Sequence, residues 1–407
     1  MLIVQKYGGT SVGGLDRIEN VAKRVAKARE EGNDLVVVVS AMSGETNKLI
    51  DYAHHFSKNP SKREMDILLS SGERVTAALL AIALQEMGHK AIALTGRQAG
   101  IQTDNSHTYA RIETINTHRI QKEIEDGNIV IVAGFQGINK NGEVTTLGRG
   151  GSDLSAVALA GALKADACEI YSDVDGIYTT DPRIEPKAKK LDFISYEEML
   201  ELSSLGAKVL QNRSVELAKK MGVKIIAKSS FTDAPGTIIA ERKEGENMEE
   251  VLVSGIALDK NQARVSLRGV TDRPGIAAEI FGRLAEKNII VDMIIQTASE
   301  GENSHKTTNL GFTVPQNQLE DAKEVIESFE HDITSADFDE NVAKVSVVGV
   351  GMKSHSGVAA TAFETLAKNN INIEMISTSE IKISMIIDEK YAELAVRELH
   401  SVYGLDK

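Results

Sequence analysis

The sequence predicts an α/β protein whose first part is a mostly parallel sheet between helices, followed by two small copies of a βαββαβ unit. Two observations carry this prediction. Up to about residue 240, continuous Val- and Ile-rich runs alternate with amphipathic helical stretches, which is typical of strands buried on both faces of a parallel sheet. Beyond residue 250, one pattern of residues occurs twice, about 80 residues apart, which indicates two similar small domains.

Strands and helices of the first part can be placed from their apolar residues. The expected strands are the apolar runs at 2–7, 34–40, 91–95, 128–135, 168–173 and 223–229. Helical spacing follows the first of them, where apolar residues recur at Leu15, Ile18, Val21, Ala22 and Val25. The stretches 73–88 and 153–165 are further expected helices. We expect these helices to cover the two faces of the sheet.

The repeat in the second part aligns residues 263–294 with 343–376. Val265 matches Val345 and Gly269 matches Gly349, and each copy later contains a second helix, at 318–329 and 391–403. The order strand, helix, two strands, helix, strand is a ferredoxin-like layout. The expected domains are 1–240, a charged linker at 241–250, and small domains at 251–335 and 336–407, with strand 251–259 able to pair with either small domain.

Composition excludes several classes of protein. The chain has 407 residues, enough for two to four domains, and a net charge of −13 without a basic run, so no nucleic-acid partner is expected. No apolar run suggests a membrane partner. One cysteine, Cys168, excludes a disulfide framework and fits a cytoplasmic location. The nine histidines lack metal-ligand spacing, so no protein metal site is expected and any metal should arrive with a substrate.

The segment VQKYGGTSVGG (4–14) is the first candidate for chemistry. Its glycines let the backbone approach an anion, and Lys6 adds a positive charge for a phosphate group. An ordinary strand-to-helix turn is an equally simple interpretation. The same segment contains GTSVG (9–13), which matches the nucleophile elbow of hydrolases, but no later histidine lies in a supporting glycine-rich context.

Two further segments carry polar groups next to glycines. In TTLGRGGSDLSAVALA (145–160), Arg149 lies among three glycines and offers a planar fork for a carboxylate, although a helix cap with a surface arginine would look the same. In YSDVDGIYTTDPR (171–183), acidic and hydroxyl residues could hold a nucleotide or its magnesium, or form a solvated loop. Neither a Walker A motif nor a complete G-x-G-x-x-G is present, so a nucleotide site would be of another type.

Together these segments closely resemble aspartate kinases of the amino acid kinase superfamily. The resemblance continues through VVVSAMSGETN (37–47), LLSSGERV (68–75), VAGFQG (132–137) and MLELSSLGAKVL (199–210), and the two C-terminal repeats resemble ACT amino-acid-sensing domains. It implies an amino acid kinase fold followed by two ACT domains. Because no homoserine dehydrogenase portion follows, the single-activity form is expected.

The resemblance also implies roles for individual residues. ATP is expected to contact Lys6, Tyr7, Gly8, Gly9, Ser172, Asp173, Tyr178, Asp181, Pro182, Arg183 and Lys208. Aspartate is expected to contact Ser40, Thr46, Glu73, Arg149, Gly150, Gly151, Ser152 and Asp153. Within these sets the expected catalytic residues are Lys6, Asp153 and Lys208.

The implied reaction is transfer of the γ-phosphoryl group of ATP to the β-carboxylate of L-aspartate. A carboxylate with a pKa of ~3.9 is ionised at neutral pH, so no general base is needed. The protein must instead bring two anions together and neutralise charge on the transferred group, with Mg²⁺ carried by ATP. The expected product, 4-phospho-L-aspartate, begins lysine, threonine and methionine biosynthesis.

The ACT-like repeats imply feedback regulation by lysine, threonine or both. The expected effector contacts are Asp272, Gly275, Ile276, Ala277, Asp292, Met293, Gln296, Asn372 and Ile373. A site shared between repeats implies a homo-oligomer, or an α2β2 assembly if Met248 starts a separate regulatory subunit. Two alternatives stay open: another enzyme of this fold, such as glutamate 5-kinase or acetylglutamate kinase, and a catalytically inactive amino-acid sensor.

Overall fold

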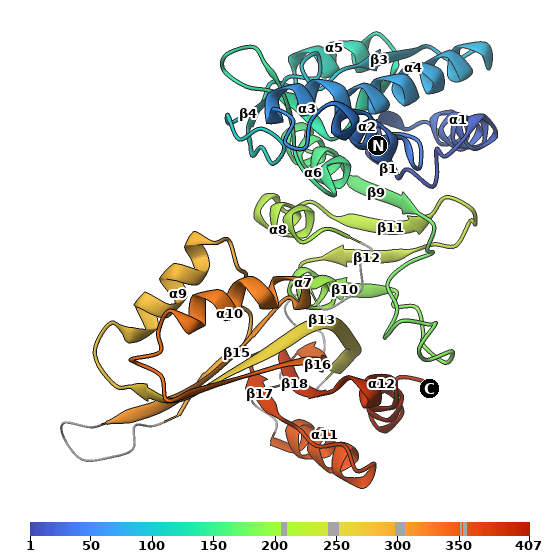
Figure 1. The fold of residues 1–407 in the computed structure, drawn as a ribbon. Helices are drawn as coiled ribbons and strands as arrows, with labels where there is room; N and C mark the ends of the chain where they lie inside the picture. The colour runs from blue at the N-terminus through green and yellow to red at the C-terminus, as the bar shows by residue number, and fades with distance from the viewer. Residues whose placement is uncertain (205–209, 243–251, 298–305, 351, 353–355) are drawn as a thin grey trace. The chain divides into compact units, whose positions relative to one another are not determined.

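The computed structural model describes residues 1–204, 210–242, 252–297, 306–350, 352 and 356–407. The chain forms two compact units, described separately below (Figure 1). The first unit comprises Met1–Ile177 and Lys190–Met248. The second comprises Tyr178–Lys189 and Glu249–Lys407.

An eight-stranded sheet forms the centre of the first unit. Its order is β10-β12-β11-β9-β1-β2-β6-β3, and the pairs are parallel except for β11 with β12. The strands are β1 (Leu2–Tyr7), β2 (Asp34–Val39), β3 (Ala91–Leu94), β6 (Ile129–Ala133), β9 (Ala167–Ser172), β10 (Phe193–Ser195), β11 (Ile225–Ser229) and β12 (Thr237–Ala240). The mostly parallel sheet predicted from the apolar runs is confirmed.

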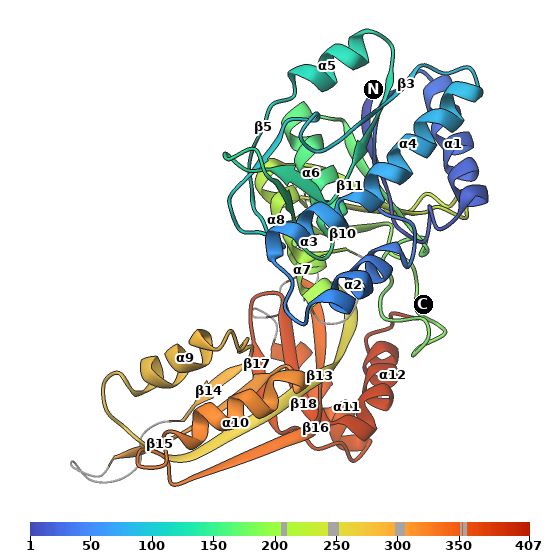
Figure 2. The same cartoon turned by 45° about the horizontal axis from the view of Figure 1, so that its top comes forward.

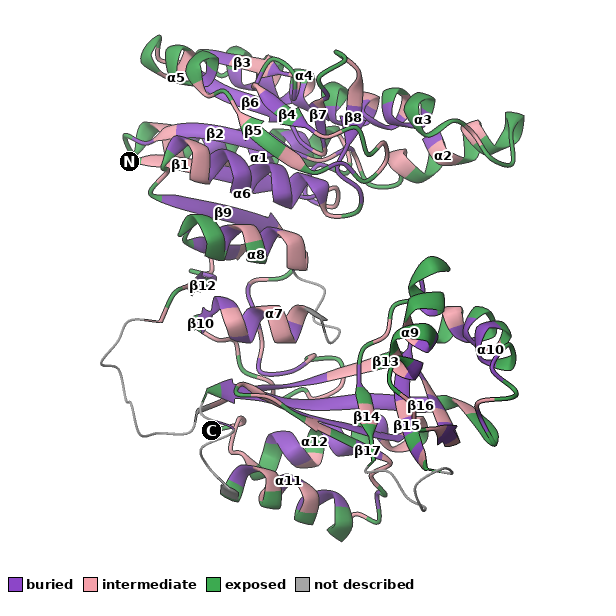
Figure 3. Cartoon of the chain, turned by 90° about the vertical axis from the view of Figure 1, so that its left-hand side faces the viewer, coloured by how far each residue is buried: buried purple, intermediate pink, exposed green. Residues whose placement is uncertain are grey.

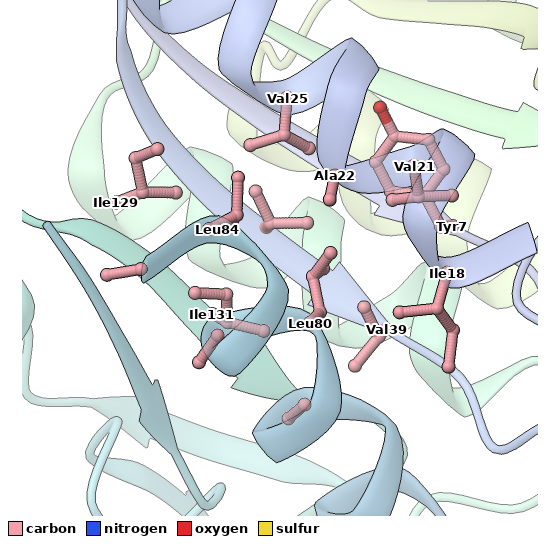
Figure 4. Packing of buried hydrophobic residues seen from close by; sticks show 14 of the residues in the cluster. Tyr7, Ile18, Val21, Ala22, Val25, Val39, Leu80, Leu84, Ile129 and Ile131 are labelled. Carbon is pink, nitrogen blue, oxygen red and sulfur yellow. The ribbon is translucent and has the colours of Figure 1, made fainter. Parts of the chain in front are cut away.

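Helices pack on both faces of this sheet. The helices α1 (Leu15–Glu30) and α4 (Ser71–Glu86) bury a core with alternate strand residues that include Tyr7, Val39 and Ile131 (Figure 4). The intervening strand residues face the other way, because side chains alternate along a strand. There α6 (Gly151–Leu163) packs against β1, β2 and β9, and it is almost wholly buried (Figure 3). The helix α8 (Asn212–Met221) packs against α6.

A smaller sheet and several short helices complete the first unit. The sheet has the order β5-β4-β7-β8 and was not foreseen from sequence. Its strands are β4 (Ile101–Thr103), β5 (Ile112–Ile115), β7 (Gln136–Ile138) and β8 (Val144–Thr146). The further helices are α2 (Glu45–Phe56), α3 (Lys62–Leu69), α5 (His118–Glu125) and α7 (Tyr196–Ser204).

The second unit is built on one six-stranded sheet of order β14-β15-β13-β16-β18-β17. Its strands are β13 (Leu252–Thr271), β14 (Ile294–Gln296), β15 (Thr307–Val314), β16 (Ser335–Val350), β17 (Met375–Thr378) and β18 (Lys382–Asp388). Its helices are α9 (Ile276–Glu286), α10 (Leu319–Glu327), α11 (Ser356–Lys368) and α12 (Ala392–Val402), with 3₁₀ turns η1 (Gln316–Gln318) and η2 (Glu389–Tyr391). Figure 2 shows α9 and α10 beside one half of the sheet and α11 and α12 beside the other.

The two repeats share this sheet through the long strands β13 and β16. Ala263–Thr271 of β13 pairs with β15 and contributes to the core under α9 and α10. The earlier residues Leu252–Asp259 pair with the end of β16, and Ile256 lies in the core under α11 and α12. The second repeat therefore receives one of its strands from the beginning of the first.

A short segment from inside the kinase-like sequence packs in the second unit. Within Tyr178–Lys189, the carbonyl of Thr179 accepts a hydrogen bond from the Ile256 N–H at 2.7 Å. The Thr179 hydroxyl lies 2.9 Å from Nε2 of His400, a buried residue of α12. Nε of Arg397 donates to the carbonyl of Ile184 at 2.9 Å. Both strand β13 and helix α12 therefore hold this segment.

One helical stretch among the described residues, Lys62–Glu86, is long and apolar enough to cross a membrane. Half of its most apolar window is buried within the fold, and it carries the buried acids Asp66 and Glu73. The core helix of a globular domain gives the same pattern.

Candidate active site

The glycine turn after β1 is shaped by close backbone contacts. The N–H of Gly8 donates to the carbonyl of Tyr171 at 3.2 Å, and the carbonyl of Gly8 accepts from the Ser11 N–H at 2.9 Å. A Cβ on Gly9 would lie 3.0 Å from the carbonyl oxygen of Ala41, closer than most side chains tolerate. The glycine at position 9 therefore lets the turn pack directly on the backbone that follows β2.

Lys6 and Asp153 form an ion pair beside this turn. Lys6 alternates with Tyr7 along β1, so its side chain lies on the face of the sheet that α6 covers. Its Nζ is 2.6 Å from Oδ1 of Asp153, which belongs to the first turn of α6, although the direction is not that of an aligned hydrogen bond. Both residues are buried. A Cβ on Gly8 would lie 3.4 Å from the same Nζ, so the ammonium borders the glycine turn.

Glu73 is a buried acid in the first turn of α4. Its Oε1 accepts a hydrogen bond from the Ala41 N–H at 3.2 Å, whereas its buried Oε2 has no hydrogen-bond partner among the described residues. Burial raises the pKa of Glu73 to about 7, although backbone hydrogen bonds, including the one from Ala41, oppose the rise. A buried carboxylate oxygen without a partner is costly, and a bound cation would remove that cost.

The loop between β8 and α6 holds Arg149 between two glycines with positive φ. Gly148 has φ 78° and Gly150 has φ 72°, a conformation that side chains with a Cβ rarely adopt. A Cβ on Gly148 would lie 2.6 Å from the Tyr109 ring, and one on Gly150 would lie 1.8 Å from Cγ of Gln211. Arg149 itself is exposed, while Gly151 and Ser152, which begin α6, are buried.

Ser40 and Asp173 directly follow the strands β2 and β9, Ser172 is the last residue of β9, and Thr46 lies in the first turn of α2. In the sheet β9, β1 and β2 are adjacent and parallel, and Tyr7 pairs with both Tyr171 and Val39. Ser172 and Ser40 therefore come to the edge at which β1 enters its glycine turn, and the Ser40 N–H donates to the Tyr7 carbonyl at 3.1 Å. Ligands of open α/β sheets bind at this carboxyl edge.

The remaining nucleotide residues of the prediction lie elsewhere. Tyr178, Asp181, Pro182 and Arg183 belong to the segment that packs in the second unit. The guanidinium of Arg183 is 2.6 Å from Oδ2 of Asp181, and this contact lowers the Asp181 pKa. Lys208 falls outside the described residues.

The predicted effector residues all belong to the second unit. Asp272 is exposed. Gly275, with a φ of 98°, directly precedes α9, and Ile276, the first residue of that helix, is buried. The carboxylate of Asp292 pairs with the buried Lys344. The other members differ in exposure: Met293 is buried, Ala277 and Ile373 are half-buried, and Gln296 and Asn372 are exposed.

Sequence reasoning missed one set of buried polar residues in the first unit. Asp66 of α3 is fully buried and contacts His107, Thr108 and Thr146. The one local signal was an acidic residue in the apolar stripe of a short helix. Among the residues that the structure describes, no group of three or more His, Cys, Asp or Glu side chains is placed to hold a metal ion.

Comparison with known proteins agrees with the fold. The model of the amino acid kinase family matches residues 1–229, and an ACT domain model matches 265–328 and 345–403. The chain is thus a kinase of the amino acid kinase family with ACT domains. It is 61% identical to the aspartokinase of Helicobacter pylori strain J99, over 100% of both chains. It also belongs to the aspartokinase family and is an ATP-dependent phosphotransferase with a carboxyl acceptor.

Solved structures give the same assignment. The fold is similar to Escherichia coli aspartokinase III in complex with aspartate and ADP, with a TM-score of 0.80 and 25% identity over 99% of both chains. It is also similar to that enzyme in complex with lysine and aspartate, with a TM-score of 0.78 and 26% identity, again over 99% of both chains.

Proposed function

We propose that the enzyme transfers the γ-phosphoryl group of ATP to the β-carboxylate of L-aspartate, giving 4-phospho-L-aspartate. One observation carries the proposal: the glycine turn beside Lys6 and the carboxylate of Glu73, whose Oε2 has no hydrogen-bond partner among the described residues, meet at Ala41. The Ala41 carbonyl packs against Gly9, and its N–H binds Glu73. A site for phosphate and a site for an amino group are thereby brought next to each other.

The substrate would be held by its amino-acid end. Its ammonium would pair with Oε2 of Glu73, and its α-carboxylate would meet the guanidinium of Arg149, a planar fork that binds a carboxylate through two hydrogen bonds. Ser40, Thr46 and the beginning of α6 at Gly151 and Ser152 would line the remainder. The structure of Escherichia coli aspartokinase III with aspartate and ADP supports a site of this kind.

Catalysis would rest on positioning and charge. The β-carboxylate of aspartate attacks without a base, so the protein's task is to offset the repulsion between two anions. Lys6 and the amide groups of Gly8 and Gly9 would contact the phosphates, with Lys208 as a second cation. Asp153 would hold the Lys6 ammonium in place until the nucleotide arrives, as their 2.6 Å contact supports.

Mg²⁺ would enter with the nucleotide. Bound to the phosphates of ATP, it would neutralise charge that develops during transfer. Asp173, an acid expected to contact ATP, has the carboxylate oxygens that Mg²⁺ prefers.

Regulation would act through the ACT domains. We expect lysine, threonine or both to inhibit, as end products of the pathway that begins with this reaction and also leads to methionine. The complex of Escherichia coli aspartokinase III with lysine supports an amino-acid effector. The expected assembly is a homo-oligomer or α2β2 with a subunit started at Met248, a residue outside the described part of the chain. The enzyme would be cytoplasmic, without nucleic-acid or membrane partners.

The decisive experiment is an aspartate-dependent ATP turnover assay on the purified enzyme. Trapping the acyl phosphate with hydroxylamine should give product with aspartate and little with glutamate, whose side chain is one methylene longer. Adding lysine, threonine and both together should lower the rate in at least one case. No nucleotide consumption with aspartate would refute the activity, and insensitivity to every combination would refute the regulation alone.

A further inference from the structure

Asp66 makes an unusually complete set of hydrogen bonds for a buried acid. It lies on the inner side of α3 and is 0% exposed. Its Oδ1 accepts from the Thr146 hydroxyl at 2.5 Å and from the Thr108 N–H at 3.0 Å. Its Oδ2 lies 2.6 Å from Nδ1 of His107. Because a buried charge is costly unless it is hydrogen-bonded, Asp66 fixes these three groups relative to α3.

The groups that Asp66 holds belong to two chain segments that support the Arg149 loop. Thr146 ends β8, three residues before Arg149, and its carbonyl accepts from the Ala110 N–H at 2.9 Å. Thr108 adopts φ 70°, a conformation that is uncommon for a residue with a Cβ and therefore needs support from its surroundings. Asp66 binds both segments at once.

Tyr109 and Arg213 contact the backbone next to Arg149 and connect it to the segments that Asp66 holds. The ring of Tyr109 packs so closely on Gly148 that a Cβ there would lie 2.6 Å from it. The guanidinium of Arg213 lies 4.5 Å from the centroid of that ring and donates to the carbonyls of Leu147 at 2.7 Å and Ala110 at 3.0 Å. The backbone on the N-terminal side of Arg149 is thus held by the ring of Tyr109 and by the guanidinium of Arg213.

The same pair of helices carries Glu73. The helix α3 ends at Leu69 and α4 begins at Ser71, and between them the buried Ser70 accepts a hydrogen bond on its carbonyl from Gln136 at 2.9 Å. Asp66, which holds the Arg149 loop, and Glu73, the proposed partner of the substrate ammonium, therefore lie on consecutive helices separated by one residue.

We propose that Asp66 is a positioning residue for the aspartate site. Through Thr146 and Thr108 it sets the position of Arg149 relative to Glu73, and so the spacing at which the α-carboxylate and the ammonium of one amino acid are both bound. This inference rests on the proposed roles of Arg149 and Glu73. A purely structural role would instead make Asp66 matter for stability and not for substrate affinity.

The first test compares two neighbouring threonines of β8. Thr146→Val removes the hydroxyl that binds Asp66, whereas Thr145→Val removes an equally buried hydroxyl that lies 2.6 Å from that of Thr103. We expect Thr146→Val to raise the KM for aspartate about 10-fold, because small misplacements of positioning groups are costly. The kcat and the KM for ATP should change less than about 2-fold, since losing an interaction that is equally strong in the ground state and the transition state leaves kcat unchanged. Thr145→Val should leave all three constants within that range.

The melting temperatures of Thr146→Val and Thr145→Val show whether the two variants lose similar stability, so that a difference in KM is not caused by unfolding. Should Thr146→Val fail to fold, Asp66→Asn keeps the shape of the side chain while removing its charge, and its control is Glu198→Gln. Glu198 is another fully buried acid, bound to Ser195 and Arg242. Asp66→Asn is expected to raise the KM for aspartate, and Glu198→Gln to lower only the melting temperature. Equal effects of the two members of either pair on the KM for aspartate would overturn the inference.

A double variant separates this inference from the proposed site. Arg149→Ala should raise the KM for aspartate by itself, and adding Thr146→Val should raise it no further if Thr146 acts through Arg149. An unchanged KM in Arg149→Ala would refute the proposed site. A raised KM in Arg149→Ala together with an unchanged KM in Thr146→Val would refute only the positioning role of Asp66.

Discussion

Nζ of Lys6 lies 2.6 Å from Oδ1 of Asp153, although one residue belongs to the central strand β1 and the other to the first turn of α6. Both side chains are buried, so the charge of each depends on the other. The pair keeps the ammonium beside the glycine turn before any nucleotide binds. We expect Lys6 to exchange this contact for phosphate oxygens when the nucleotide binds.

Replacing Lys6 by alanine should lower kcat by about 10²- to 10³-fold, because it removes the cation that we propose contacts the transferred phosphoryl group. Steady-state assays with saturating aspartate and ATP measure the effect, and circular dichroism checks the fold. Lys228→Ala is the matched control, since Lys228 also pairs with a buried acid, Glu169, at 2.9 Å on a strand of the same sheet. A Lys6→Ala enzyme with normal turnover would contradict the assignment.

Glu73 should give the affinity for aspartate a dependence on pH. Its pKa is raised to about 7 by burial, and only its charged form attracts an ammonium. The value of kcat/KM for aspartate should therefore rise between about pH 6 and pH 8, because this ratio reports groups of the free enzyme. In Glu73→Gln the step should disappear and the KM for aspartate should be high throughout. Persistence of the same step in the variant would assign it to another group.

The same shift in pKa makes a prediction about stability. The folded pKa of Glu73, about 7, lies above the ordinary value of 4.5, so the folded state holds a proton that the unfolded state has lost. Stability from this group is complete below about pH 4.5 and is lost as the pH rises through about 7. Glu73→Gln should therefore be the more stable protein at pH 8, by about 3 kcal/mol, with little difference at pH 5. Urea unfolding of both proteins at the two pH values measures this.

Gly148→Ala should raise the KM for aspartate and lower stability. Alanine would be strained at φ 78°, and its Cβ would lie 2.6 Å from the Tyr109 ring beside Arg149. Gly142 has nearly the same φ, 80°, but open space around it. Gly142→Ala should therefore lose only the ~1 kcal/mol of backbone strain and keep its KM. Equal KM values in the two variants would show that the contact with Tyr109 does not matter for binding.

His400→Ala should raise the KM for ATP several-fold and leave that for aspartate unchanged. The ring of His400 holds the Thr179 hydroxyl, and the segment around Thr179 includes residues expected to contact the nucleotide. Burial lowers the pKa of His400, so the ring is neutral at pH 7 and the effect should be present there. His331 is a histidine of the same unit with a side chain that is 94% exposed, and His331→Ala is the control. The measurement is the KM for ATP of His400→Ala and of His331→Ala, and equal values would contradict the prediction.

The elements with a strong local pattern were predictable from the sequence. The buried runs of β1, β2, β6 and β9 and the amphipathic helix α1 lie within a residue or two of the expected ranges. The sheet β5-β4-β7-β8 was missed because its strands have three or four residues, too few for a period to emerge. The partner of strand 251–259 was left open between the two small domains, because the division of β13 between two cores depends on pairing with β16, which no local pattern records.

The candidate site also contains residues that the sequence predicted and a residue that it could not predict. Lys6 was named from its place in a glycine turn, whereas the roles of Glu73 and Asp153 came from the resemblance to aspartate kinases. The structure brings Lys6 and Asp153 together. Their catalytic roles stay predictions. Asp66 could not be named, because its importance lies in three contacts from distant parts of the chain. An isolated aspartate in a short helix gives no sign of the partners that the fold supplies.

The packing of Tyr178–Lys189 in the second unit means that the chain passes between the units more than once. A protein shortened to residues 1–240 would keep this segment but lose Ile256 and His400, which bind it. Conversely, a polypeptide started at Met248 would have the Ile256 N–H and the His400 ring without Thr179, and water or another copy of the chain must replace it. A chimera that exchanges the sensor domains of related enzymes would therefore have to exchange residues 178–189 as well.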